Sequence, residues 1–304
     1  MKKKEFFVKT IFPNLTHFTL NRTSFVENIF LKPISVDQSE KPNIEAFLQR
    51  NRKDTLTKYE LRNLPSKLTE KELGDIESDS EWKNLFTEIQ EILAEQNNKV
   101  QIGCLGWMCA EFFKVREFSR QLWLHSAFVT FCCKQIRSSN EHRGRYARLL
   151  SSSSLANEKR FDFENPTVEK NFRDVLLALS DTLREQFSRQ GKQKLQILPS
   201  LGQLLILAAR YDESESSEIR PKSGKFESSS VLCPPPCFSL VIRCLGPEEA
   251  QLQSLAAQII EIHAFISAKS RFSQSGVEAG LALWSMATRT NTDSLKIIAF
   301  GALV

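Results

Sequence analysis

The chain has 304 residues, of which 41% are hydrophobic and 25% are charged. This composition is typical of a folded globular protein with one large domain or two ordinary ones. The 41 basic residues nearly balance the 36 acidic ones, and a net charge of only +5 argues against nucleic acid or an anionic membrane as the partner.

The N-terminal segment, residues 1–65, shows no sustained hydrophobic period, and its prolines alternate with polar side chains. This pattern predicts an extended, partly disordered lead-in. The basic start does not continue as a signal peptide, because Lys9 interrupts the apolar run and no small-residue cleavage site follows.

Residues 66–137 are predicted to form the first helical repeats. Over 82–93 the apolar side chains recur every three or four residues, which is the period of an amphipathic helix. Two further helices are expected over about 100–118 and about 120–136 by the same pattern.

Helix start signals occur at several positions. Thr69 followed by Glu72 has the spacing of a capping box, and Asp79 or Ser80 is the expected N-cap of the helix that follows. Thr167, directly after a proline, is the expected cap of a later helix.

Residues 138–166 are rich in serine and arginine and show no period, so they are predicted to form a loop. The candidate site residues for an anion or phosphate group are four arginines: Arg137, Arg143, Arg145 and Arg148. The alternative is a solvated loop, because the segment lacks the interleaved aromatic residues of a single-strand binding platform. The neighbouring serines are candidates for phosphorylation, which would invert the local charge.

Residues 167–304 are predicted to form further helical repeats. The stretch 201–209 is apolar at nearly every position, which predicts a helix packed against neighbours on several sides. Pro199 is expected to kink this helix or delay its start. The polar gap 212–231 is expected to be a loop, and more helices follow it.

The predicted fold class is therefore all-α, an α-solenoid of HEAT or armadillo type. Helix pairs recur at about forty residues, as in such repeats, although unequal helix lengths leave a globular helical bundle as the alternative. No uncharged apolar run reaches the roughly 18 residues of a spanning helix, so no membrane span is expected. The chain stops while still apolar, in LKIIAFGALV, and the array is expected to be truncated there.

No catalytic or metal-binding motif is complete. Cys233 and Cys237, in CPPPC, lack the second pair of ligands that a zinc knuckle needs, and they indicate a rigid start to the next helix. His142 is followed by Arg-Gly where a kinase catalytic loop has Arg-Asp, and no glycine-rich loop accompanies it. The chain is predicted not to be an enzyme, with no cofactor, metal or small-molecule substrate. The odd count of seven cysteines favours reduced thiols in the cytosol.

Five elements in the second half of the chain occur in a distinctive order. They are Leu198–Leu204, Arg243–Leu245, Ala256–Glu261, Trp284 and Asp293–Ile297. In this order they resemble the helical-repeat region of the family of the fourth uncoordinated-51-like kinase and plant Runkel, which is related to Fused.

This family has an N-terminal kinase-like domain, a linker and a long repeat array, and the present sequence lacks the kinase-like part. The resemblance implies a cytoplasmic scaffold whose protein partners are associated with microtubules or cilia. The leading hypothesis is a non-catalytic scaffold segment for protein–protein interaction. One alternative is a regulatory segment of a serine/threonine kinase or pseudokinase whose catalytic domain lies outside this chain. Another is a binder of phosphate or lipid headgroups through the arginines.

Overall fold

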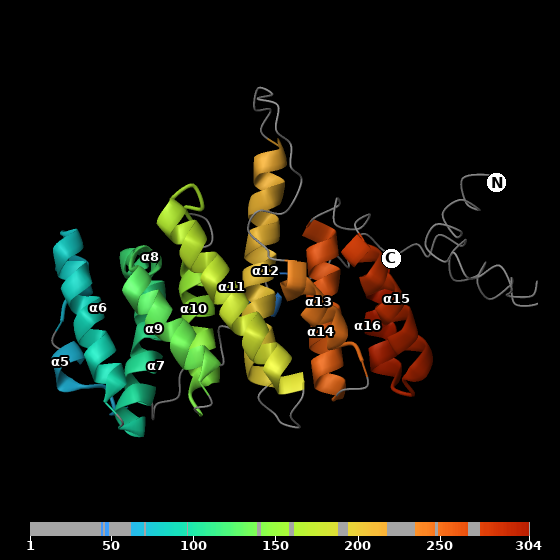
Figure 1. Cartoon of the computed structure of the whole chain (residues 1–304), viewed down its shortest axis with the longest axis horizontal. Helices are drawn as coiled ribbons and strands as arrows, with labels where there is room; N and C mark the ends of the chain where they lie inside the picture. Colours follow the sequence, from blue (N-terminus) through green and yellow to red (C-terminus); the bar gives the residue numbers. More distant parts are fainter. Residues whose placement is uncertain are drawn as a thin grey trace, which may run out of the picture. The chain divides into compact units, whose positions relative to one another are not determined.

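The computed structural model describes residues 44, 46–48, 62–69, 71–95, 97–138, 141–157, 161–187, 194–217, 235–246, 249–266 and 274–303. These residues form helices, turns and connections, and none of them lies in a β-strand (Figure 1). The all-α fold class is therefore confirmed for this part of the chain.

The helices follow one another with short connections. In chain order they are α5 (Ser66–Thr69), the 3-10 helix η3 (Leu73–Asp75), α6 (Asp79–Ala94), α7 (Asn98–Lys114), α8 (Arg116–Leu124), α9 (Ser126–Arg137), α10 (Arg143–Ala156), α11 (Pro166–Phe187), α12 (Lys194–Ser217), α13 (Pro235–Arg243), α14 (Ala250–Ile266), α15 (Gln274–Arg289) and α16 (Asp293–Leu303).

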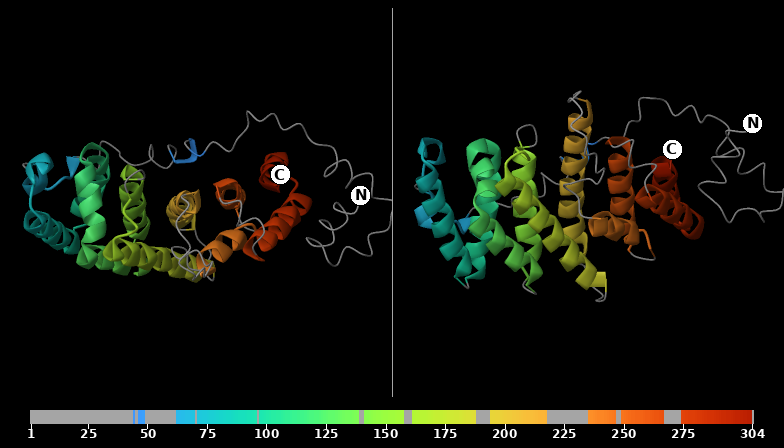
Figure 2. Two further views of the ribbon diagram at one scale, coloured as in Figure 1. Left: turned by 90° about the horizontal axis from the view of Figure 1, so that it is seen from above. Right: turned by 45° about the horizontal axis from the view of Figure 1, so that its top comes forward.

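The longer helices pack in pairs and in two layers (Figure 2). α6 packs against α7, α9 against α10, α11 against α12, α13 against α14, and α15 against α16. Between pairs, α6, α9, α11, α13 and α15 contact one another in succession, and we call them layer A. Likewise α7, α10, α12, α14 and α16 contact one another in succession and form layer B. The short helix α8 contacts α6, α7, α9, α10 and α11.

Helix α12 is apolar nearly all round because other helices surround it. It contacts α10 and α14 within layer B, and α11 and α13 of layer A. Leu201, Leu204 and Leu205 have no exposed surface. A Cβ atom at Gly202 would lie closer than 3.0 Å to the side chain of Ile259, so the glycine permits the close approach of α14. The prediction that 201–209 is packed on several sides is confirmed.

The segment 98–137 forms three helices where two were expected. The chain leaves the helical conformation at Val115, with φ −114° and ψ 90°, and again at His125, with φ −93° and ψ 81°. Nδ1 of His125 accepts a hydrogen bond from the backbone N–H of Phe128 and so caps α9. Apolar side chains continue at helical spacing across both breaks, which is why periodicity did not reveal them.

Helix α6 begins with a capping box one residue before the expected cap. The hydroxyl of Ser78 accepts from the backbone N–H of Glu81, and the Glu81 carboxylate accepts from the backbone N–H of Ser78. Asp79 and Ser80 therefore lie inside the helix. Thr69 ends α5 and does not cap a helix, so that expectation is wrong.

The start of α11 and the end of α12 also differ from the boundaries that the sequence predicted. Asn165 caps α11, since its Oδ1 accepts from the backbone N–H of Thr167 at 2.9 Å, and Thr167 is not the cap. Helix α12 continues to Ser217, so the first part of the expected loop 212–231 is helical. Residues 218–231 lie outside the described part of the chain.

The prediction of a loop at 138–166 is wrong for about half of the segment, because Arg143–Ala156 forms α10 of layer B. Its serines occupy core positions: Ser151, Ser152, Ser153 and Ser154 are all at most 4% exposed. The hydroxyls of three of them donate to the backbone carbonyl three residues earlier, which satisfies them without water. Small polar side chains in the core conceal the apolar period of this helix.

Of the lead-in, 1–65, the structure describes only residues 44, 46–48 and 62–65, and the rest lies outside the described residues. Residues 44 and 46–48 are helical, and Phe47 and Leu48 are buried in the core. The expectation of an extended chain is therefore wrong at these positions. No described helix combines the length and the apolar character that crossing a bilayer requires.

Candidate anion-binding groove on layer B

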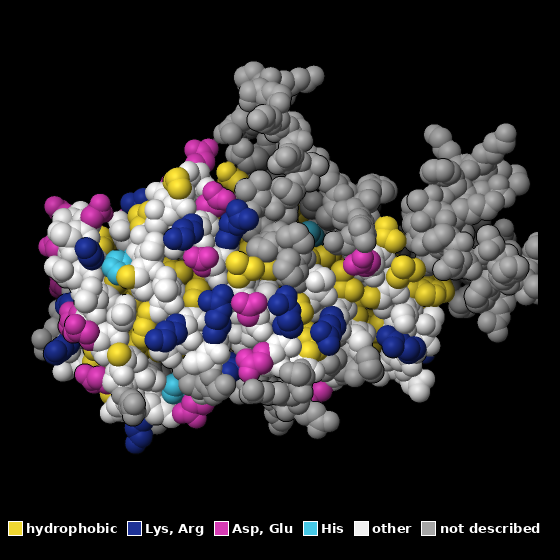
Figure 3. Space-filling view, viewed as in Figure 1, with side chains coloured by type: hydrophobic (Ala, Val, Ile, Leu, Met, Phe, Trp, Pro, Cys, Tyr) yellow, Lys and Arg dark blue, Asp and Glu magenta, His cyan; other side chains and the backbone are white. Residues whose placement is uncertain are grey.

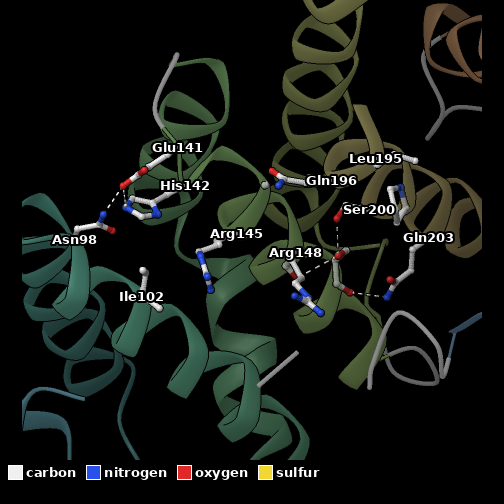
Figure 4. A pocket seen from close by; sticks show the side chains of 13 residues that line it. Asn98, Ile102, Glu141, His142, Arg145, Arg148, Leu195, Gln196, Ser200 and Gln203 are labelled. Carbon is white, nitrogen blue, oxygen red and sulfur yellow. Dashed lines mark hydrogen bonds and ion pairs between the residues drawn. The ribbon is translucent and has the colours of Figure 1, made fainter. Parts of the chain in front are cut away.

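A cavity of about 580 Å³ lies between α7, α10 and α12, which are consecutive helices of layer B (Figure 4). Its described wall residues lie within 98–102 of α7, 144–151 of α10 and 195–203 of α12, together with the two residues that precede α10. The polar residues that dominate the wall are Asn98, Arg145, Arg148, Gln196, Ser200 and Gln203.

Two of the four candidate arginines line this cavity. Arg145 and Arg148 are three residues apart on α10, and this spacing places their side chains on one face of the helix. Both are partly exposed, and Figure 4 shows them between α7 and α12. The structure therefore brings two of the four candidate arginines to one cavity, on a helix where the sequence predicted a loop.

The other two arginines do not contribute to the groove. Arg137, at the end of α9, lies on layer A, where its Nη2 is 3.3 Å from Oδ2 of Asp181 on α11. Arg143 is only 3% exposed and does not line the cavity. No described residue accepts a hydrogen bond from its Nε atom.

Among the described residues that line the cavity, Glu141 is the one acidic residue, and it is already engaged. Glu141 accepts a hydrogen bond from the side-chain amide of Asn98 and lies 3.5 Å from Nε2 of His142. Burial lowers the pKa of His142 below its ordinary value, Glu141 opposes this shift, and Arg145 adds to it. The imidazole is therefore neutral at pH 7, and the described lining residues include two guanidinium groups and one carboxylate.

The floor of the groove is held by hydrogen bonds between α10 and α12. The hydroxyl oxygens of Ser151 and Ser200 are 3.1 Å apart, and Nε2 of Gln203 donates to the backbone carbonyl of Ser151 at 2.8 Å. At Gly144 a Cβ atom would come within 3.0 Å of the Gln196 side chain. The glycine thus leaves room for this exposed amide at the rim.

The four serines of α10, which the sequence offered as candidates for phosphorylation, are buried in the folded chain. Oγ of Ser119 donates to the backbone carbonyl of Ser153 at 2.7 Å, and the Asn157 amide donates to Oγ of Ser119. Ser153 and Ser154 are at most 1% exposed. A kinase cannot reach these hydroxyls unless the helix leaves the core.

The groove was not predicted from the sequence, although one pattern in the sequence indicates it. On the nearly continuous apolar face of α12, Gln196, Ser200 and Gln203 recur at spacings of four and three residues. They form a polar stripe on an otherwise buried helix. Asn98 carries no such signal, because it is brought to the groove from a distant helix.

A second cavity, of about 330 Å³, lies on the same layer between α14 and α16. Leu255 and Ile298 provide partly buried apolar surface there, and Ser254 and Ser294 provide hydroxyl groups. Its described wall residues lie within 250–258 of α14 and within 292–298 at the start of α16. None of the described residues that line it has an ionisable side chain.

The cysteines of the described residues are buried and form no disulfide. In α13, Cys237 accepts a hydrogen bond from the hydroxyl of Ser180 at 3.0 Å, so it acts as a packing residue. Cys233 lies outside the described part of the chain. Pro235 is the first residue of α13, where proline is well tolerated. Burial raises the pKa of Cys133 to about 12, which makes this thiol unreactive.

The described residues contain no group of three or more His, Cys, Asp or Glu side chains arranged to hold a metal ion. The described lining of the first cavity contains guanidinium, amide and hydroxyl groups. These groups suit carboxylates, phosphates and the polar main chain of a peptide.

The chain is similar to the serine/threonine-protein kinase ULK4 of Mus musculus. The two sequences are 26% identical over 250 residues, an alignment that covers 79% of this chain and 18% of the mouse protein. The chain thus spans less than a fifth of the length of this relative. No family model and no solved structure matches the chain. The similarity supports a relation between this chain and ULK4.

Proposed function

We propose that the chain is a non-catalytic scaffold segment, an α-solenoid of HEAT or armadillo type that binds a protein partner through layer B. The observation that carries this proposal is the succession α7, α10, α12, α14, α16, in which each helix packs against the next. Stacked helix pairs of this kind present a continuous surface built from several repeats, and such surfaces are suited to peptide or helix recognition.

The pattern of contacts favours a solenoid over the globular bundle. Among the described residues, every extensive contact joins helices of the same pair or of neighbouring pairs, with α8 counted with α9 and α10. Helix α7, for example, has extensive contacts with α6, α8 and α10 only. A bundle would bring helices distant in sequence around one shared core. Stacking of neighbours alone is the organisation of a repeat array.

The proposed location is the cytoplasm, and the proposed partner is associated with microtubules or cilia. Both proposals rest on the family resemblance. The similarity to ULK4 supports the resemblance over most of the chain. No catalytic role is proposed for any residue of the chain. The polar groups of the groove include guanidinium, amide and hydroxyl groups, which suits them to binding.

The test compares two double variants. Each removes two positive charges, one variant from layer B and the other from layer A. Arg145→Gln with Arg148→Gln alters the groove of layer B, and Arg173→Gln with Arg184→Gln alters exposed positions of layer A. In affinity capture from cell extract, with mass spectrometry, we expect a partner that the layer A variant retains and the layer B variant loses. Equal loss from both variants, or phosphoryl transfer by the purified chain, would contradict the scaffold function.

The alternative is a regulatory segment of a serine/threonine kinase or pseudokinase. The similarity to a protein named as a kinase favours it, although the matched part is 18% of that protein. The test is to mix the chain with a separately produced kinase-like domain of the mouse protein. Binding that changes the nucleotide affinity of this domain would support regulation, and no binding would leave the scaffold as the better proposal.

A further inference from the structure

We propose that residues 44 and 46–48, which we call the docking turn, are an internal ligand of layer B, and that the surface of α12 beside them recognises a short amphipathic helix of a partner protein. This inference rests on the proposed scaffold function and adds regulation to it, because the partner must displace the docking turn. It follows from the burial of the turn, from its position beside α12 and from the way the later part of the lead-in meets α7.

The docking turn is held by apolar side chains on one face of a helix. Phe47 and Leu48 follow Ile44 by three and four residues, a spacing that places all three side chains on the same side. Phe47 is 6% exposed and Leu48 is 7% exposed. Both belong to the hydrophobic cluster of the helical repeats, and Ile44 packs against that cluster. The turn is therefore seated on the repeats through its apolar face.

The docking turn lies on layer B. Both views of Figure 2 show it, in blue, next to α12, and the left view shows it on the side of layer B that faces away from layer A. The polar stripe of α12, which lines the first cavity, continues four residues after Gln203 with Leu207. Leu207 is only 7% exposed. An apolar position of α12 thus lies on the face where the turn is seated.

The lead-in meets layer B a second time, at α7. A Cβ atom at Gly103 would come closer than 3.0 Å to the backbone of Asn63 and Leu64, so the glycine lets the chain pass directly against this helix. α7 and α12 both pack against α10, one on each side of it in the succession of layer B. Two described parts of the lead-in are therefore seated on the layer that is proposed to bind a partner.

The docking turn can leave while the repeat array stays folded. α12 is held by α10, α11, α13 and α14, and these are contacts between repeat helices. A single turn of helix is not stable by itself, and a segment held by few side chains opens at a lower free energy than the core does. Its departure uncovers apolar surface on α12, which favours the binding of another apolar segment.

The internal ligand indicates the chemistry of the partner. A helix with an apolar residue followed three and four residues later by an aromatic and an aliphatic residue can make the same contacts, as in helix-in-groove recognition. An extended strand cannot, because its successive side chains point to opposite sides. The partner competes with a tethered segment, whose effective concentration is about 1 mM.

The test uses a fluorescent synthetic peptide with the sequence of residues 41–50, and its binding to the full chain is followed by fluorescence anisotropy. A tethered competitor at about 1 mM weakens the binding of a peptide with a Kd of about 0.1 mM about tenfold. Phe47→Ala with Leu48→Ala removes this competition, so the peptide should bind the variant about tenfold more tightly than the wild type. A peptide with both of these residues replaced by alanine should bind neither chain.

The matched control is Leu177→Ala with Leu281→Ala, which removes two exposed apolar side chains from helices of layer A. It should bind the peptide as the wild type does. Circular dichroism establishes that each variant is folded. Equal binding of the peptide to the wild type and to Phe47→Ala with Leu48→Ala would overturn the proposal. Loss of the helical signal in that variant would also overturn it, because the turn would then be a required part of the core.

A second measurement tests displacement without removing the docking turn. The thiol introduced by Leu48→Cys is labelled with iodoacetamide, and the labelled position is located by mass spectrometry. Excess peptide should raise the labelling rate at position 48 several-fold, because the peptide takes the place of the turn. The rate for Ile297→Cys, at a position that is 71% exposed on α16, should not change. A peptide that binds without raising the rate at position 48 would show that it binds elsewhere, which contradicts the proposal.

Failure of this proposal and failure of the scaffold function give different results. If the peptide binds the wild type and Phe47→Ala with Leu48→Ala alike, while a captured partner still depends on layer B, the internal ligand is wrong and the scaffold function stands. If no captured partner depends on layer B, the scaffold function is wrong. Tighter binding to the variant would then show a docking contact within the chain, and its role in partner binding would be wrong.

Discussion

The side-chain amide of Asn171, on α11, donates a hydrogen bond of 2.7 Å to the backbone carbonyl of Trp123, in the last turn of α8. The last carbonyl groups of a helix have no partner within the helix. The hydroxyl of Thr182, also on α11, likewise donates to the carbonyl of Ile136 in the last turn of α9. One helix thus satisfies the C-terminal ends of two preceding helices, which fixes the register between neighbouring pairs.

Asn171→Ala should lower the free energy of unfolding by about 1–3 kcal/mol, because it leaves the buried carbonyl of Trp123 without a donor. Asn171 is 2% exposed, so water does not readily replace the amide. Urea unfolding followed by circular dichroism measures the change. The control is Arg173→Ala on the exposed face of α11, where loss of the pair with Glu169 should cost less than about 0.5 kcal/mol. Equal effects of the two substitutions would show that the amide contributes nothing.

Gly202→Ala should destabilise the packing of α12 against α14, since the added Cβ would overlap the side chain of Ile259. Overpacking of this kind costs about 1–3 kcal/mol. Gly74→Ala is the matched control, because a Cβ there meets no atom within 4 Å.

A double-mutant cycle tests the cause of this effect. Ile259→Ala alone should cost about 2–5 kcal/mol through the cavity that it leaves. Combined with Gly202→Ala, it should cost less than the sum of the two, because the added methyl enters the vacated space. Strict additivity in urea unfolding would mean that the two side chains do not meet.

Stability should fall with pH between 6.5 and about 4 through His263. Burial lowers the pKa of this side chain from 6.5 to about 4, and its ring packs on Phe238 with the centroids 4.7 Å apart. As pH falls below 6.5 the unfolded chain takes up a proton before the folded chain does. The stability is therefore fully present above pH 6.5, and about 3 kcal/mol at most is lost by pH 4, because part of the ring remains accessible to water.

The measurement is the difference in unfolding free energy between the wild type and His263→Leu across this pH range. The lowered pKa values of His125 and His142 act in both proteins, so their contributions cancel in the difference. A difference that does not change with pH would show that His263 titrates alike in the folded and unfolded chains.

Ile297→Lys should reduce self-association of the purified chain. Ile297 is 71% exposed on α16, Leu281 is 42% exposed on α15, and apolar side chains gather near these helices in the face shown in Figure 3. Exposed apolar surface favours association. Light scattering over a concentration series should show a smaller increase in mean mass for Ile297→Lys than for Ser294→Lys, which adds the same charge at an exposed polar position. Equal behaviour of the two variants would exclude this surface.

The helices with a clear apolar period could be predicted from the sequence. Trp82 and its partners in α6 are buried as their spacing indicates, and the all-round apolar stretch of α12 is surrounded as expected. Helix α10 could not be predicted in the same way. Its core positions are filled by serines such as Ser153, a residue type that a sequence pattern indicates as solvent-exposed. The Ser153 hydroxyl is satisfied in the core because it donates to the backbone carbonyl of Leu150 in the same helix.

For the candidate site too, some properties could be predicted from the sequence and others could not. The sequence alone determined that the chain is helical and that 201–209 lies in a core, since these properties depend on residues close together along the chain. It also named Arg145 and Arg148 as candidate cations, although it predicted a loop where they lie on α10. Only the tertiary structure decided that Asn98 and Gln203 meet on the wall of one cavity with these arginines, and that Arg137 pairs with Asp181 on the other layer. The physical reason is that the packing of helix on helix depends on the shapes and hydrogen bonds of side chains distant in sequence, and periodicity along one helix carries no information about its neighbour.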